Sequence, residues 1–171
     1  MIFQDVERAI LSGQYVSIYK MNKANGENAQ VSYYKKLDVW MVASKNVCLA
    51  LKNRGDINFY KGMRFDYAKR IASAWFDILG NMSADKVRDM KAAMSGKTLV
   101  GEYVGHPDLQ HLVRYDRETI TFYAISDHTT TETCIPVISG FNFFKRFGLD
   151  YVKCENVGSY NNLTYFYIFL E

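Results

Sequence analysis

Apolar residues recur at every second position over much of the chain, which is the period of a half-buried β-strand. This alternation predicts strands at residues 15–19, 28–34, 37–43, 47–51, 98–104, 111–114, 119–126 and 151–155. Residues 163–170 are nearly all apolar and predict a further, central strand. Only Lys35 and Lys36 separate the second and third of these strands, so we expect them to form a hairpin.

In three places the apolar period lengthens to between three and four, as in a helix. Residues 3–11 predict a short helix that ends at Ser12 and Gly13. Tyr67, Ile71 and Trp75 share one face of a second helix, and Ser83 is a typical cap for a third. Residues 141–147 fit a helix or an aromatic-rich irregular segment, and residues 53–62 predict a loop. We therefore predict an α+β fold of antiparallel sheets with an inserted helical pair at about residues 65–95.

Composition narrows the class of protein. With 171 residues, 49% of them apolar and 15% aromatic, the chain is suited to one well-packed domain and is unlike a disordered protein. The net charge of +3 permits a nucleic-acid partner without requiring one. No apolar run reaches the roughly 20 residues of a membrane helix, so we expect no membrane partner. Three widely spaced cysteines indicate neither a disulfide framework nor a zinc site and favour a reducing compartment, cytoplasmic or nuclear.

The stretch Lys23-Ala24-Asn25-Gly26 carries the first candidate chemistry. A lysine amine attacks phosphorus only when neutral, whereas an unperturbed lysine has a pKa of ~10.4, so a nucleophilic lysine needs nearby cations or burial. Lys20 and Lys45 are candidate cations. Glycine allows close approach of the backbone to a phosphate. The alternative interpretation is an ordinary hairpin turn with a solvated lysine.

Further stretches follow this one in order: Trp40-Met41-Val42-Ala43-Ser44-Lys45-Asn46, Leu99-Val100-Gly101-Glu102-Tyr103-Val104 and Ile120-Thr121-Phe122-Tyr123-Ala124-Ile125. From about residue 15 to about residue 127, the series resembles the ATP-dependent RNA ligases, in particular the fungal tRNA ligase and phage-type branch of the covalent nucleotidyltransferases. The resemblance implies an adenylation domain of the nucleotidyltransferase (ATP-grasp-like) fold over residues 1–171. It also implies ATP and Mg²⁺ or Mn²⁺ as cofactors and RNA ends as partners.

The resemblance assigns a role to each matching residue. Lys23 is expected to form the lysyl-AMP intermediate. Asn25 and Gly26 complete its loop, and Lys45 contacts the nucleotide. Glu102 acts at the ribose and the metal, and its carboxylate suits a hard cation. Tyr123 stacks on the purine, or Phe122 does so if the register is shifted by one residue.

The chain departs from the family pattern in its last motifs. The family continues with a Glu-Gly motif and a strand with two lysines that hold the α-phosphate, and neither is found among the 171 residues. We expect the chain to be part of a longer protein, truncated at its C-terminal end, with further domains or a C-terminal remainder. Otherwise the site is degenerate or is completed by another polypeptide.

Three other groups of residues have competing interpretations. Either Lys52 and Arg54 contact a phosphate, or they belong to an ordinary charged loop. The basic residues of the helical pair form an RNA-tracking surface or, with interspersed aspartates, a mixed solvated face. His106 and His111 lack further ligands at the spacing of a transition-metal site.

The sequence thus favours an RNA ligase that forms lysyl-AMP, transfers AMP to an RNA 5′-phosphate and seals it to a 3′-hydroxyl in RNA repair or processing. Alternatives that share the lysine chemistry are an mRNA-capping guanylyltransferase and a DNA ligase. A further alternative is a non-catalytic nucleotide- or RNA-binding relative.

Overall fold

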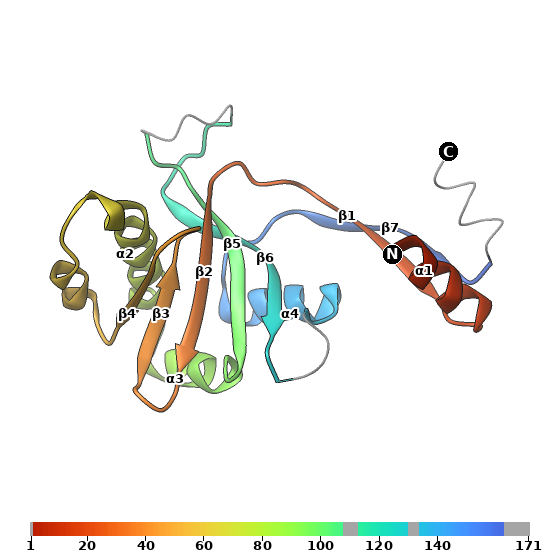
Figure 1. The fold of residues 1–171 in the computed structure, drawn as a ribbon, viewed down its shortest axis with the longest axis horizontal. Helices are drawn as coiled ribbons and strands as arrows, with labels where there is room; N and C mark the ends of the chain where they lie inside the picture. Colours follow the sequence, from red (N-terminus) through yellow and green to blue (C-terminus); the bar gives the residue numbers. More distant parts are fainter. Residues whose placement is uncertain (1, 108–112, 130–133, 163–171) are drawn as a thin grey trace. The chain divides into compact units, whose positions relative to one another are not determined.

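A five-stranded antiparallel sheet forms the centre of the larger of two compact units (Figure 1). The computed structural model describes residues 2–107, 113–129 and 134–162. Residues 23–152 belong to the larger unit, and the smaller unit contains the described parts of residues 1–22 and 153–171. The prediction of one adenylyltransferase domain over residues 1–171 stays a prediction.

The large sheet has the strand order β4-β3-β2-β5-β6. Its strands are β2 (Glu27–Tyr34), β3 (Val39–Ala43), β4 (Cys48–Leu51), β5 (Lys97–Val104) and β6 (Thr119–Asp127). The same unit contains the 3₁₀ helices η1 (Arg54–Phe59) and η2 (Met63–Phe65), and the α-helices α2 (Asp66–Gly80), α3 (Ala84–Ala93) and α4 (Val137–Phe147).

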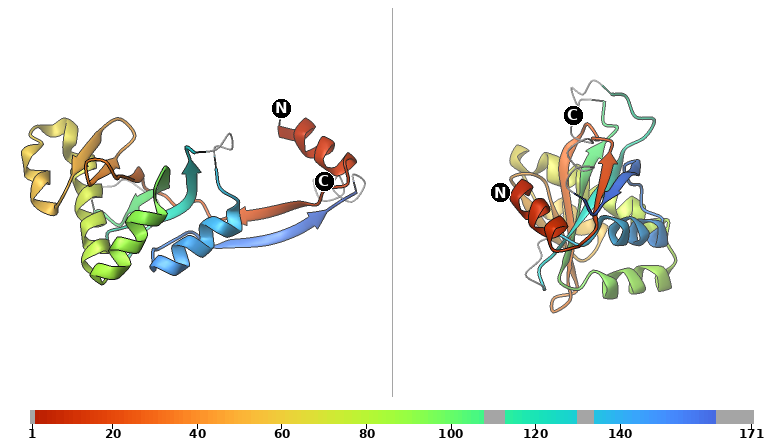
Figure 2. Two further views of the ribbon diagram at one scale, coloured as in Figure 1. Left: turned by 90° about the horizontal axis from the view of Figure 1, so that it is seen from below. Right: turned by 90° about the vertical axis from the view of Figure 1, so that its right-hand side faces the viewer.

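The helices α2 and α4 pack on the same face of this sheet, below the strands in Figure 2, left. Phe122 of β6 is fully buried and contacts both helices, through Trp75 of α2 and Phe144 of α4. Trp40 of β3 extends the aromatic core with a ring contact to Trp75. We call this the core face of the sheet, and the opposite side its open face.

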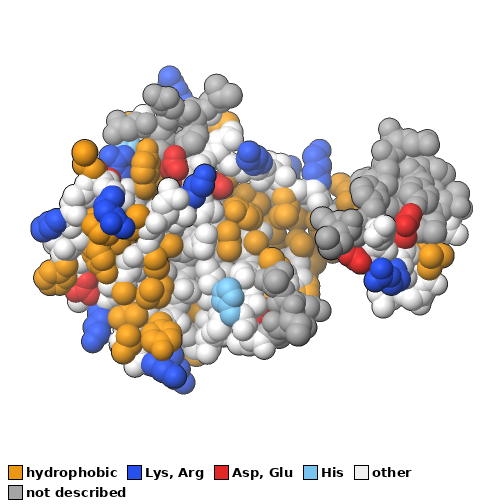
Figure 3. Space-filling model, in the orientation of Figure 1, with side chains coloured by type: hydrophobic (Ala, Val, Ile, Leu, Met, Phe, Trp, Pro, Cys, Tyr) orange, Lys and Arg blue, Asp and Glu red, His pale blue; other side chains and the backbone are white. Residues whose placement is uncertain are grey.

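The open face of the sheet is turned toward the viewer in Figure 3. Lysine and arginine side chains of the larger unit lie mainly along the edges of this view, and hydrophobic side chains lie between them. The positive charge is therefore not gathered in one central patch over the strands, and a charged ligand would have to be recognised by individual residues.

The smaller unit pairs β1 (Val16–Met21) with β7 (Cys154–Tyr160) in an antiparallel ribbon, and helix α1 (Ile2–Leu11) contacts β1. Ile10 is its one buried apolar side chain among the residues whose burial is described. In the described parts of both units, none of the helices combines the length and the apolar character that a membrane span requires.

Most predicted elements are present, with three differences. The predicted loop at 53–62 contains η1, because Asn53 and Asp56 form a capping box that nucleates a turn of helix. The predicted strand at 151–155 is displaced, since β7 begins at Cys154 and Tyr151 makes only an isolated bridge to Phe122. Val113 and Arg114 lie in irregular backbone rather than in a strand, and the rest of that prediction is outside the described residues. The strand predicted at 163–170 also lies outside them. Residues 141–147 are helical.

Candidate functional site

The segment that carries Lys23 is not a hairpin turn. Residues 22–26 connect β1 to β2, but β1 pairs with β7 whereas β2 pairs with β3 and β5. Lys23 is exposed and makes no hydrogen bond or ion pair with the described residues. Its amine is therefore available to a ligand rather than committed to a structural contact.

The rest of this loop is held closely against neighbouring backbone. A Cβ atom on Gly26 would lie 2.3 Å from the Tyr103 carbonyl oxygen and 2.8 Å from Val104 Cγ1. The backbone N–H of Asn25 donates a hydrogen bond of 2.9 Å to the Tyr115 hydroxyl. Glycine at position 26 is required by this close approach, because any side chain would displace the loop from β5.

A polar cluster lies on the open face next to this loop, in the first residues of β2 and the facing parts of β5 and β6. Asn28 pairs with Glu102 across the sheet, and Glu102 pairs in turn with Thr121. The Gln30 side-chain amide donates to Asn28 Oδ1 at 3.0 Å. The pKa of the Tyr123 phenol is raised, first by burial and then by the charge of Glu102, while a hydrogen bond from Asn28 opposes this rise. The structure thus brings Glu102 and Tyr123 together and adds Asn28 as their common neighbour.

A β-bulge decides which aromatic residue of β6 can reach a ligand. Gly101 of β5 pairs with Phe122 of β6, and the neighbouring Val100 pairs with Ala124. Tyr123, between Phe122 and Ala124, therefore has no partner in β5 and is the additional residue of the bulge. Phe122 is fully buried in the core, whereas Tyr123 is half-buried beside Glu102. Stacking by Phe122 would require the core to open, which leaves Tyr123 as the aromatic residue that is accessible on this face.

Lys45 is less closely joined to the cluster. It lies exposed in the turn between β3 and β4, which is closed by a hydrogen bond from the Ser44 N–H to the Val47 carbonyl. Ala43, the last residue of β3 before this turn, pairs with Gln30 of β2. The turn therefore lies at the same end of the sheet as Asn28, two residues before Gln30. Lys45 makes no hydrogen bond or ion pair with the described residues.

Several of the other sequence candidates are engaged in structural contacts, whereas the exposed Lys52 side chain makes no hydrogen bond or ion pair with the described residues. Arg54 binds Asp77 and also donates to Ser73 Oγ at 2.8 Å, so its charge is already paired. On the helical pair, Arg88 contacts Asp85 and Lys91 contacts Asp38, as expected for a mixed charged face. His111 lies outside the described residues.

The donor set of the cluster limits the kind of cation that it can hold. Among the described residues, no three His, Cys, Asp or Glu side chains converge as a metal site. The cluster offers the single carboxylate of Glu102 on the open face. One carboxylate fits a Mg²⁺ ion that is shared with nucleotide phosphates, and does not fit a cation held by protein ligands alone.

Sequence reasoning missed Asn28, Gln30 and Tyr115. The alternation of β2 places Asn28 and Gln30 on the face opposite the buried Ala29 and Val31, and this pattern was a usable signal. The contact of Tyr115 with Asn25 joins residues 90 positions apart, and a single sequence carries no sign of it.

Comparison with known proteins places this geometry on a known fold. No protein-family model matches the sequence, and no curated protein matches it significantly. Three solved structures of Naegleria gruberi RNA ligase match: a lysine-to-alanine variant with ATP and Mn, the enzyme with pyrophosphate, and an apo aspartate-to-alanine variant. Their TM-scores are 0.55, 0.54 and 0.55, at 14%, 13% and 13% sequence identity.

The match covers 93%, 92% and 92% of this chain, and 41% of each ligase chain. The chain therefore spans about two fifths of the length of the solved structures that it matches. It is a mixed α+β structure with antiparallel sheets, and it has an RNA ligase-like fold.

Proposed function

We propose that this chain is the adenylyltransferase part of an ATP-dependent RNA ligase, with Lys23 as its nucleophile. The observation that carries the proposal is the arrangement of an uncommitted Lys23 amine, a Gly26 loop packed on β5, and the Glu102–Tyr123 cluster on a ligase-like sheet. A cation, an aromatic face and a carboxylate are the groups that a purine nucleotide with its metal requires.

In the proposed reaction the neutral Lys23 Nζ attacks the α-phosphorus of ATP. A P–N bond forms, the bond from the α-phosphorus to the pyrophosphate oxygen breaks, and Nζ loses a proton. An oxygen of the RNA 5′-phosphate then attacks the phosphorus of the lysyl-AMP, the P–N bond breaks and the Lys23 amine is released. A 3′-hydroxyl next attacks the RNA 5′-phosphorus, AMP leaves and the strand is sealed. A divalent cation, when bound with ATP, supplies charge neutralisation at the phosphates, and Glu102 is the residue that would hold it.

Each remaining residue has a binding or positioning role. The face of Tyr123 stacks on the purine, and the hydrogen bond from Asn28 orients its phenol. Asn25 and Gly26 fix the loop, so that Lys23 reaches the phosphate without a costly rearrangement. Lys45 approaches the nucleotide from the β3–β4 turn and contributes positive charge.

The test is covalent labelling of the chain with α-labelled ATP and Mg²⁺ or Mn²⁺. We expect an acid-labile label on the wild type, none on Lys23→Ala, and a wild-type level on Lys35→Ala, which removes another exposed lysine. A label that persists in Lys23→Ala would exclude Lys23 as the nucleophile. Labelling by GTP in place of ATP would indicate a capping guanylyltransferase, and joining of nicked duplex DNA rather than RNA would indicate a DNA ligase.

The second candidate is a non-catalytic nucleotide- or RNA-binding relative. It is favoured by the exposed position of Lys23, which an ordinary solvated lysine would share. This candidate predicts that ATP or RNA binds, as measured by calorimetry, while neither nucleotide labels the protein and Lys23→Ala binds as tightly as the wild type.

A further inference from the structure

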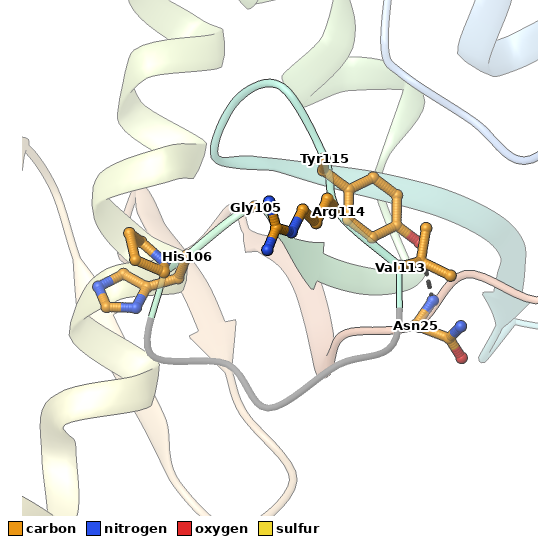
Figure 4. Close-up of a pocket in the computed structure, with 7 residues that line it drawn as sticks. Asn25, Gly105, His106, Val113, Arg114 and Tyr115 are labelled. Atoms are coloured by element: carbon orange, nitrogen blue, oxygen red, sulfur yellow. Dashed lines mark hydrogen bonds between the residues drawn. The ribbon is translucent and has the colours of Figure 1, made fainter.

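A polar pocket of about 490 Å³ lies beside the loop that carries Lys23, and none of the roles above uses it (Figure 4). Asn25 of this loop lines one side, and Gly105 and His106 line another. The described lining also includes Pro107, Val113, Arg114 and Tyr115. The pocket lies wholly within the unit of residues 23–152.

The charge of this pocket comes from Arg114. Its side chain extends toward the wall formed by Gly105 and His106 (Figure 4), and the residue is exposed. Arg114 makes no hydrogen bond or ion pair with the described residues. Two acidic side chains are engaged elsewhere, since Glu118 accepts from the buried Tyr103 and Asp150 accepts from Arg117 at 2.6 Å, and the exposed Asp116 makes no ion pair with Arg114. The guanidinium thus faces the pocket with its charge unpaired by the described residues.

A second arginine supports the opposite wall. Arg70 of α2 lies 2.8 Å from His106 Nδ1, and because a guanidinium only donates, this nitrogen must accept. The Arg70 guanidinium therefore supports the ring of His106 through this contact. Among the described lining residues, the exposed guanidinium of Arg114 is the group that favours an anion.

The pocket is also joined to the candidate nucleophile. Tyr115, adjacent to Arg114 in sequence, accepts the hydrogen bond from the Asn25 backbone, two residues after Lys23. The wall at Gly105 is fixed as well, because Gly105 has φ +89° and a Cβ atom there would lie 2.0 Å from the Arg117 carbonyl oxygen. A ligand on Arg114 is thus held by the same segment that positions the Lys23 loop.

We propose that Arg114 binds a phosphate group of the substrate that reacts at Lys23, a site that the sequence did not indicate. The planar fork of a guanidinium matches two phosphate oxygens, and a charge-assisted pair of this kind is stronger than contacts to neutral groups. This inference rests on the proposed function for the identity of the substrate. The phosphate belongs either to the pyrophosphate portion of ATP or to the 5′ end of RNA.

The experiment measures binding to the full chain carrying Lys23→Ala, so that no covalent step takes part. Its probes are inorganic pyrophosphate and a matched pair of oligoribonucleotides with a 5′-phosphate or a 5′-hydroxyl. Arg114→Gln is compared with Arg114→Lys, which keeps the charge without the fork, and with the control Arg88→Gln, an exposed arginine of α3.

We expect Arg114→Gln to weaken binding by about 10- to 100-fold, Arg114→Lys to weaken it less, and Arg88→Gln to leave it unchanged. Loss confined to pyrophosphate assigns the site to ATP, and loss confined to the 5′-phosphorylated RNA assigns it to RNA. Equal binding by all variants, or no binding of any probe, would overturn the proposal. Because labelling by ATP is measured separately, failure of the Lys23 chemistry is distinguished from failure of the phosphate site.

Discussion

Gly26 allows a sharp test of the loop at the scale of one residue. A Cβ atom at this position would lie within 2.3 Å of the Tyr103 carbonyl oxygen, and backbone cannot move as freely as a flexible side chain. We expect Gly26→Ala to lower the free energy of unfolding by about 1–3 kcal/mol, as overpacking does, and to abolish labelling by ATP. Urea unfolding and the labelling assay measure the two effects.

Gly80→Ala is the matched control, because a Cβ on Gly80 at the end of α2 meets no atom within 4 Å. This control is expected to raise the free energy of unfolding by at most about 1 kcal/mol, since alanine favours the helix. If Gly26→Ala were as stable and as active as Gly80→Ala, the close packing of the loop on β5 would be irrelevant to the site.

The sequence predicted residues of the site more readily than their contacts. Lys23, Glu102 and Tyr123 could be named because each belongs to an ordered local stretch. The bulge that separates Phe122 from Tyr123 could not be foreseen, since the alternation of β6 continues on either side of it and only its pairing with β5 shows the additional residue. The contact of Asn25 with Tyr115 depends on the tertiary fold alone.

The turn between β2 and β3 is tied to α3 by an ionic cluster. Asp38 has φ +50°, a conformation that aspartate tolerates better than most residues, and it accepts hydrogen bonds of 2.6 Å from both Lys91 and Tyr33. The hydrogen bond from Lys91, followed by that from Tyr33, lowers the pKa of Asp38 below its ordinary value of 3.8. The same contact, aided by burial, raises the pKa of Tyr33 to about 12.

This cluster makes a prediction about pH. Because the pKa of Asp38 is lower in the folded state, its contribution to stability is present above pH 3.8 and is lost as the pH falls through the folded-state pKa. We expect Asp38→Asn to lower the urea midpoint at pH 7, and the two proteins to converge toward about pH 2. Asparagine also tolerates positive φ, so the substitution changes the charge and little of the backbone.

Asp116→Asn is the control, since Asp116 is exposed and makes no contact of this kind with the described residues. A difference between wild type and Asp38→Asn that stayed constant over the whole pH range would contradict the ionic origin of the effect.

At the scale of elements, the sequence predicted this hairpin and α3 from their periods. It did not predict η1, whose Asn53 and Asp56 equally fit an ordinary turn.

At the scale of the whole molecule, the two units differ in how much core they possess. Residues 23–152 contain the sheet and the aromatic cluster of Trp75, Phe122 and Phe144. The smaller unit has a two-stranded ribbon and one short helix among its described residues, and an isolated ribbon is only marginally stable in water. We therefore expect a fragment of residues 23–152 to unfold cooperatively in urea, as followed by circular dichroism and tryptophan fluorescence.

A fragment of residues 23–136 is the comparison, because it lacks α4 and with it the stacking of Phe144 on Phe122. This shorter fragment is expected to lose its cooperative transition. Equal cooperativity of the two fragments would show that α4 adds nothing to the core.

The sequence predicted the α+β class, but not the division of β1 and β7 from the other strands, because their pairing joins strands from opposite ends of the chain.

The β-bulge of β6 also determines how the chain would respond to the loss of one residue. Deleting Ala124 would let β6 pair with β5 in regular register, and the hydrogen-bond ladder would become more complete. The same deletion would bring Tyr123 opposite Val100, where the bulge now places Ala124. The aromatic face would thereby move one position along β6, away from its place beside Glu102. In this strand an irregular ladder accommodates both a buried Phe122 and an accessible Tyr123. A deletion at the bulge should therefore alter the site more than the sheet, whereas a deletion in the regular strand β2 would turn the following side chains to the opposite face.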